Sequence, residues 1–157
     1  MANRQNDSRW WVQIGADRDS LPLLERAKAR GLKTLVFDSQ AGAAGASLAT
    51  SFQVRPPGDL VSIRAEVRAL ARHAVIAGCA TLERDADAMR AVASIQNDCD
   101  GFGPSPETCE LLIAGSAWKK ALTDAGIPTP VSAILESPTE LDRFLGAYPS
   151  VLLKPAT

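Results

Sequence analysis

The sequence has 157 residues, enough for one well-packed domain with a short extension. Apolar residues make up 46% and the formal net charge is −1, so a sizeable core is expected and no nucleic-acid or anionic-membrane partner is indicated. Residues 1–9 are polar, unlike a signal peptide, and no apolar run is long enough to span a membrane. Three widely spaced cysteines, Cys79, Cys99 and Cys109, lack metal-site spacing, which predicts no metal site and favours reduced thiols in the cytoplasm.

Short apolar runs alternate with helical patterns in the first two thirds of the chain. Continuous apolar runs are typical of strands buried on both faces of a parallel sheet. The alternation therefore predicts the α/β class, with a Rossmann-like parallel sheet flanked by helices. The predicted strands are 10–15, 33–38, 51–55 and 73–77, and the predicted helices begin near residues 20, 59 and 85.

A second segment follows the turn-forming sequence DGFGPSP, residues 100–106. Helices are predicted from 105 and over 116–125, and Ser137 with Glu140 has the spacing of a capping box for a third helix. Strands are predicted at 131–135 and 151–153. The last of these has no visible partner, so we expect a truncated chain. The predicted domains are a tail at 1–9, the Rossmann-like domain at 10–104, and linker helices with a truncated α+β lobe at 105–157.

Three polar or flexible positions of the first domain are candidates for a site. Gly15 ends the first strand, where open α/β sheets bind ligands, although a glycine that simply makes the turn is the alternative. Asp38 ends the second strand, where a dinucleotide-binding fold holds the ribose. The motif GxGxxG is absent after the first strand, so a capping or turn role is expected for Asp38. His73, the single histidine, is interpreted as structural.

Three stretches carry a resemblance to a known family. They are Trp11–Asp38, Gly101–Leu112, and the series AGIPTP, SPTEL and YPSVLLKP between Ala125 and Pro155. Together they resemble the ATP-grasp superfamily, especially its carbamoyl-phosphate-synthase-like and polysaccharide-cluster members. On this resemblance the chain comprises the pre-ATP-grasp domain and the start of the ATP-grasp module.

The resemblance implies an ATP-dependent ligase. Such enzymes convert a carboxylate to an acylphosphate, which an amine or another nucleophile then attacks. The lysine of the "lKP" motif carries over to Lys154 as a contact to the ATP phosphates. Gly15, from its place at the end of the first strand, is the candidate for a substrate contact. The catalytic residues and the ligands of Mg²⁺ are expected beyond residue 157, so this chain alone should be inactive. The expected partner is a small-molecule carboxylate, and a homodimer is a further expectation.

One departure from the family pattern concerns the basic residue that precedes the GIPTP motif. Gly115 occupies that position, and Lys119 and Lys120 follow one turn later as candidates to replace the contact. Two other functions stay open at this point. The chain could be a Rossmann-type NAD(P) domain, against which the missing GxGxxG argues, or a stand-alone interaction module that is not an enzyme.

Overall fold

The computed structural model of the protein describes residues 8–101, 103–148 and 150–154. The chain divides into two compact units, Met1–Cys109 and Glu110–Thr157, and each is described here by itself. The domain boundaries predicted from the sequence stay predictions. Among the described residues, no helix has both the length and the apolar character needed to cross a bilayer.

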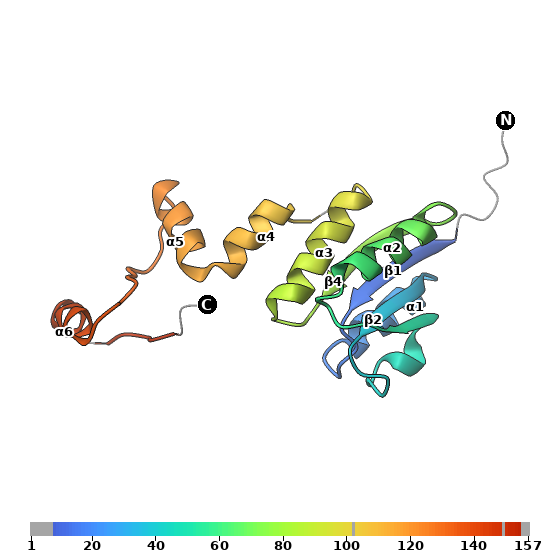
Figure 1. Ribbon diagram of the computed structural model, residues 1–157, viewed down its shortest axis with the longest axis horizontal. Coiled ribbons are helices and arrows are strands. Elements are labelled where there is room, and N and C mark those ends of the chain that lie inside the picture. Colours follow the sequence, from blue (N-terminus) through green and yellow to red (C-terminus); the bar gives the residue numbers. More distant parts are fainter. Residues whose placement is uncertain (1–7, 102, 149, 155–157) are drawn as a thin grey trace. The chain divides into compact units, whose positions relative to one another are not determined.

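The first unit is built on a parallel sheet with strand order β3-β2-β1-β4. The elements in chain order are β1 Arg9–Ile14, α1 Leu21–Ala29, β2 Lys33–Asp38, the short 3-10 helix η1 Ala46–Leu48, β3 Ser51–Val54, α2 Leu60–Ala71, β4 Val75–Thr81 and α3 Ala86–Asp98. This confirms the predicted fold class. The sheet grows from β1 toward β3 and then continues on the other side of β1 with β4. Right-handed connections that run in opposite directions place their helices on opposite faces, and Figure 1 shows α1 on one face with α2 and α3 on the other.

Two apolar clusters fill these two faces. The larger one joins Val12, Ile14 and Phe37 of the sheet to Ile63 of α2 and Ile95 of α3. The smaller one lies on the α1 side and is centred on Ala16, Leu24 and Val36. After Lys33 every residue of β2 is buried, as the sequence predicted for a central parallel strand.

The fourth strand differs from its prediction, because β4 begins two residues later than expected and continues to Thr81. The apolar pattern weakens at Gly78, which suggested an end. The structure gives Gly78 a different role, because a Cβ there would lie 2.9 Å from the ring of Trp11. The pairing register of β1 and β4 also shifts between Trp10 and Trp11. Gly78 therefore allows a bulky neighbour to pack on the strand without ending it.

The second unit contains helices but no buried side chain among its described residues. Helix α4 (Pro106–Ile113) crosses the boundary between the units, and α5 (Gly115–Asp124) and α6 (Pro138–Ala147) follow. Ser137 caps α6 as predicted, accepting a hydrogen bond from the Glu140 N–H at 3.3 Å. The capping box is altered, because the Glu140 carboxylate accepts from the Glu136 N–H at 2.7 Å instead of from Ser137.

The strands predicted at 131–135 and 151–153 are wrong for this chain. Neither segment pairs with another strand within residues 8–101, 103–148 and 150–154, and residues such as Val131, Ile134 and Leu152 are at least 63% exposed. A strand is stable only with a hydrogen-bonded neighbour and a face to pack on. The sequence pattern indicates that these residues favour an extended backbone. The described residues contain no strand next to them with which they could form hydrogen bonds.

Candidate functional site

The carboxyl end of β1 is the point where the order of the strands reverses. In open α/β sheets, ligands bind outside the carboxyl ends of the strands at such a point. Gly15 makes the turn there with φ of 85°, a left-handed conformation that favours glycine. Its N–H donates to the carbonyl oxygen of Phe37 at 2.8 Å, which ties the turn to β2. We call residues 15–16 the Gly15 turn.

Asp38 fixes the Gly15 turn from the neighbouring strand. Its side chain is buried, with 7% of the residue exposed. One carboxylate oxygen accepts from the Ala16 N–H at 2.7 Å and the other accepts from the Gln40 N–H at 2.7 Å. The turn role that the sequence predicted for Asp38 is therefore confirmed. Both oxygens accept a hydrogen bond from the backbone, as a residue that fixes a turn does.

Glu83 also contacts the Gly15 turn, and the sequence pattern did not reveal it because β4 was predicted to end at Ala77. A Cβ on Gly15 would lie 2.6 Å from Cδ and 2.7 Å from Cγ of Glu83, so the missing side chain of Gly15 leaves the room that Glu83 occupies. Burial raises the pKa of the Glu83 carboxyl, and the charges of Asp38, Asp85 and Asp17 raise it further. An acidic residue just after a buried strand was the signal that could have revealed it.

The four acidic residues Asp17, Asp38, Glu83 and Asp85 form what we call the carboxylate cluster. Asp17 accepts from the Ser20 N–H at 3.0 Å and from the Ser20 hydroxyl at 2.7 Å, and Asp85 caps α3. Within the described ranges no group of three or more acidic, histidine or cysteine side chains could hold a metal ion. Chemically, such a cluster favours hydroxyl or ammonium groups of a small molecule over phosphates.

The lysines predicted for nucleotide binding belong to the second unit. Lys154 is exposed at the end of the described chain, in a segment without regular structure. Lys119 is half-buried on α5, and Gly115 is the first residue of that helix. Lys120 makes an ion pair with Asp124 at 2.7 Å. The roles predicted for Lys154 and Lys119 stay predictions, and so does the substrate role of Gly15.

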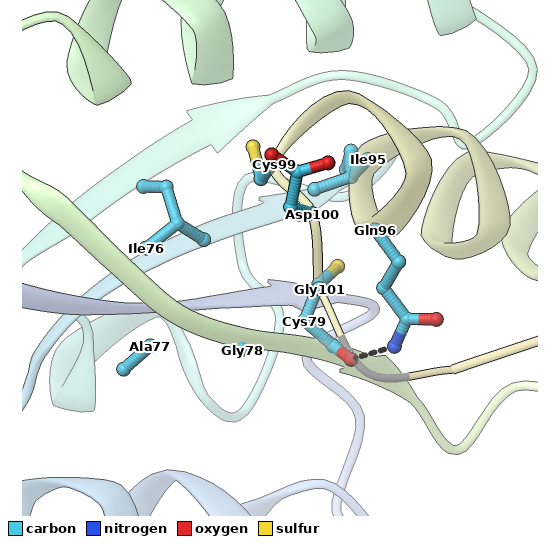
Figure 2. Close-up of a pocket in the computed structure, with 9 residues that line it drawn as sticks. All are labelled: Ile76, Ala77, Gly78, Cys79, Ile95, Gln96, Cys99, Asp100 and Gly101. Carbon is cyan, nitrogen blue, oxygen red and sulfur yellow. Dashed lines mark hydrogen bonds between the residues drawn. The ribbon is translucent and has the colours of Figure 1, made fainter.

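A small pocket lies between β4 and the carboxyl end of α3 (Figure 2). Its volume is about 170 Å³, below the roughly 300–1,000 Å³ of most small-molecule sites. The Gln96 side-chain amide donates to the Cys79 carbonyl oxygen at 2.9 Å across it, as the dashed line in Figure 2 shows. Burial raises the pKa of the Cys79 and Cys99 thiols, so both are neutral and poorly nucleophilic. We assign this pocket no ligand.

Sequence comparisons do not assign the chain to a family. No protein-family model matches the sequence. A search of curated proteins also gives no match.

Structural comparison does find similar proteins. Phosphoribosylglycinamide synthetase from Anaerococcus prevotii superposes with a TM-score of 0.67 and 19% identity, over 88% of this chain and 34% of that one. N5-carboxyaminoimidazole synthetase from Staphylococcus aureus, solved as a complex with ADP, gives 0.66 and 14%, over 93% and 38%. An L-amino acid ligase from Bacillus licheniformis gives 0.59 and 17%, over 91% and 43%.

These structures are ATP-grasp ligases, and the match falls on their N-terminal parts. The chain spans between about a third and somewhat over two fifths of their lengths. Since the identities are 19% or lower, the likeness concerns the fold. The protein has the α/β fold of the N-terminal part of ATP-grasp ligases.

Proposed function

We propose that this chain is the N-terminal portion of an ATP-dependent carboxylate ligase. Its parent enzyme would convert a small-molecule carboxylate to an acylphosphate, which an amine or another nucleophile then attacks. The observation that carries the proposal is the match of about nine tenths of the chain to the N-terminal parts of several ligases. One of these structures holds ADP, which supports a nucleotide as the shared ligand.

Within this proposal the two units have different tasks. The Gly15 turn and the carboxylate cluster contribute contacts to the substrate, because they lie where parallel sheets bind ligands. Lys154 contributes an exposed ammonium group to the phosphates of ATP, and Lys119 is a secondary contact. Charge stabilisation of this kind is the main contribution of a protein to phosphoryl transfer. Mg²⁺ would bind together with ATP, through ligands that this chain does not supply.

We further propose that the chain alone does not catalyse ligation, and that it works in the cytoplasm. The second suggestion is supported by the three cysteines, which are all free thiols in the structure. A homodimer stays a prediction, for which no described contact argues.

Nucleotide binding tests the proposal directly. The isotope-labelled chain is titrated with Mg²⁺-ATP and, separately, with NADH, while amide NMR signals are followed. We expect Mg²⁺-ATP to shift the signals of residues 150–154 weakly but saturably. Lys154→Ala should weaken binding about tenfold, which corresponds to the loss of one charge-assisted contact of about 1.4 kcal/mol.

Lys28→Ala is the matched control, because Lys28 is an exposed lysine on α1 of the other unit. It should leave the affinity for Mg²⁺-ATP unchanged. Saturable shifts around Gly15 with NADH, and none with Mg²⁺-ATP, would reverse the proposal in favour of a dinucleotide-binding domain. Acylphosphate formation by the chain itself would contradict its inactivity.

A further inference from the structure

Glu83 lies against the Gly15 turn, and its carboxyl group also makes a side-chain hydrogen bond to Asp85. Its Cγ, Cδ and one carboxylate oxygen occupy the space where a side chain at position 15 would stand. The backbone N–H of Glu83 is fixed by the hydroxyl of Thr81 at 3.0 Å. The end of β4 therefore directs this carboxyl group onto the turn.

Three acids from separate segments of the chain act on Glu83. Asp17 follows β1, Asp38 ends β2 and Asp85 precedes α3. Among the described residues, each charge that shifts the pKa of Glu83 belongs to one of these three acids, and each raises it. Asp38 and Asp85 are held in place by hydrogen bonds to backbone amides, so they cannot turn away without losing those bonds.

The Glu83 carboxyl group makes a side-chain hydrogen bond to Asp85, which two ionised carboxylates cannot make with each other. Asp38 makes two hydrogen bonds of 2.7 Å to the backbone, whereas the Glu83 side chain extends from residues 82–84, which have no regular structure. When the Glu83 carboxyl group is neutral, its packing against Gly15 does not bury a charge. When it is ionised, both desolvation and the three neighbouring charges oppose that position.

We propose that Glu83 is a proton-dependent cover of the Gly15 turn, which lies on Gly15 when neutral and moves into solvent when ionised. The cover is favoured at low pH and is lost as the pH rises through the pKa of Glu83 in the folded protein. The turn is then open at higher pH. The consequence for substrate access rests on the proposed function, whereas the conformational change itself does not.

An NMR titration of the labelled 157-residue chain tests the cover. The carboxyl carbon of Glu83 and the amide of Gly15 are followed against pH, without ligand. We expect Glu83 to titrate above the usual range of a glutamate, and the Gly15 amide to shift with the same midpoint. In Glu83→Gln, which stays neutral, this step of the Gly15 amide should disappear.

Variants of the neighbouring acids assign the cause. Asp38→Asn should lower the midpoint of Glu83, and Asp17→Asn should lower it as well if Asp38→Asn does not fold. Asp87→Asn is the matched control, because Asp87 is an exposed acid next along α3 that is not among the charges acting on Glu83. In this variant the titration midpoint of Glu83 should match that in the unmodified chain.

Two outcomes overturn the proposal. One is a Glu83 midpoint within the usual glutamate range. The other is a Gly15 amide step that persists in Glu83→Gln. Neither outcome bears on nucleotide binding, so the proposed ligase function would stand or fall separately.

Discussion

The two units of this chain form helices by the same local rules but differ in what they bury. In the first unit, Asp59 caps the start of α2, because its carboxylate accepts a hydrogen bond from the Ser62 N–H. The apolar side of this helix packs Ile63 and Val67 into the core. In the second unit, Ser137 caps the start of α6 in an equivalent way, yet none of the residues of this helix is buried. Capping and periodicity therefore specify where a helix starts, whereas burial against a sheet decides how much it stabilises the fold.

The ion pairs show the same contrast. The Asp98 carboxylate on α3 accepts bidentate hydrogen bonds of 2.7–3.0 Å from Arg64 and from Arg68 of α2. The Asp98 side chain is only 9% exposed. Lys120 and Asp124 of α5 form an equally short pair at 2.7 Å, but their side chains are 76% and 61% exposed. The ion pairs of Asp98 join α3 to α2, whereas the Lys120–Asp124 pair lies within α5.

The largest expected effect is the loss of a core ring. Phe37 on β2 is fully buried, so Phe37→Ala should lower the free energy of unfolding of the first unit by about 3–5 kcal/mol. The matched variant Phe144→Ala in α6 removes a half-buried ring that contacts Tyr148, and should cost about 1 kcal/mol or less. Amide hydrogen exchange in β1 and β2, and in α6, measures each effect. Equal losses would show that the second unit has a core of its own.

A methyl group on the Gly15 turn should have an intermediate effect. Gly15→Ala imposes a left-handed backbone on alanine and also collides with Glu83, for a cost of about 2–3 kcal/mol. Gly126→Ala, after α5, shares the positive φ but has nothing within 4 Å of the new methyl group. It should cost only the backbone strain, about 1 kcal/mol. Urea unfolding measures the effect of Gly15→Ala, and amide hydrogen exchange at the end of α5 measures that of Gly126→Ala. If the Glu83 side chain moves aside without cost, the two losses of stability should be nearly equal.

The smallest of the three effects concerns Asp98. The guanidinium of Arg64, and with it Arg68, lowers the pKa of Asp98 from 3.8 to about 2. Because both arginines are partly exposed, Asp98→Asn should cost about 1–2 kcal/mol at pH 7. A lowered pKa means that this stability is present above about pH 4 and is lost as the pH falls toward about 2.

The control for Asp98 is Asp124→Asn in the exposed pair of α5. It should change stability by less than about 0.5 kcal/mol, because solvent screens such pairs. Urea unfolding at pH 7 and pH 3 measures both variants. An Asp98 effect of the same size at the two pH values would argue against the assigned cause.

Sequence reasoning reached most of the first unit but only part of the site. The run KTLVFD is apolar because β2 is buried on both faces, so its bounds were predicted correctly. The end of β4 was misplaced, since Gly78 serves the ring of Trp11 and does not end the strand. Because of that error Glu83 was not predicted as a site residue. A carboxylate can be assigned to the edge of a sheet only when the end of the preceding strand is predicted correctly.

The sequence by itself determined the helix starts, the buried parallel strands and the turn at Gly15, because caps, apolar periodicity and backbone freedom act over a few residues. The tertiary structure decided which strands exist and which acids meet. Residues 131–135 and 151–153 have the composition of strands but find no strand to pair with in the described part of the chain. Glu83 lies 68 positions along the chain from Gly15 yet is in contact with it. Pairing and charge clustering depend on segments that are distant in sequence, so local patterns cannot specify them.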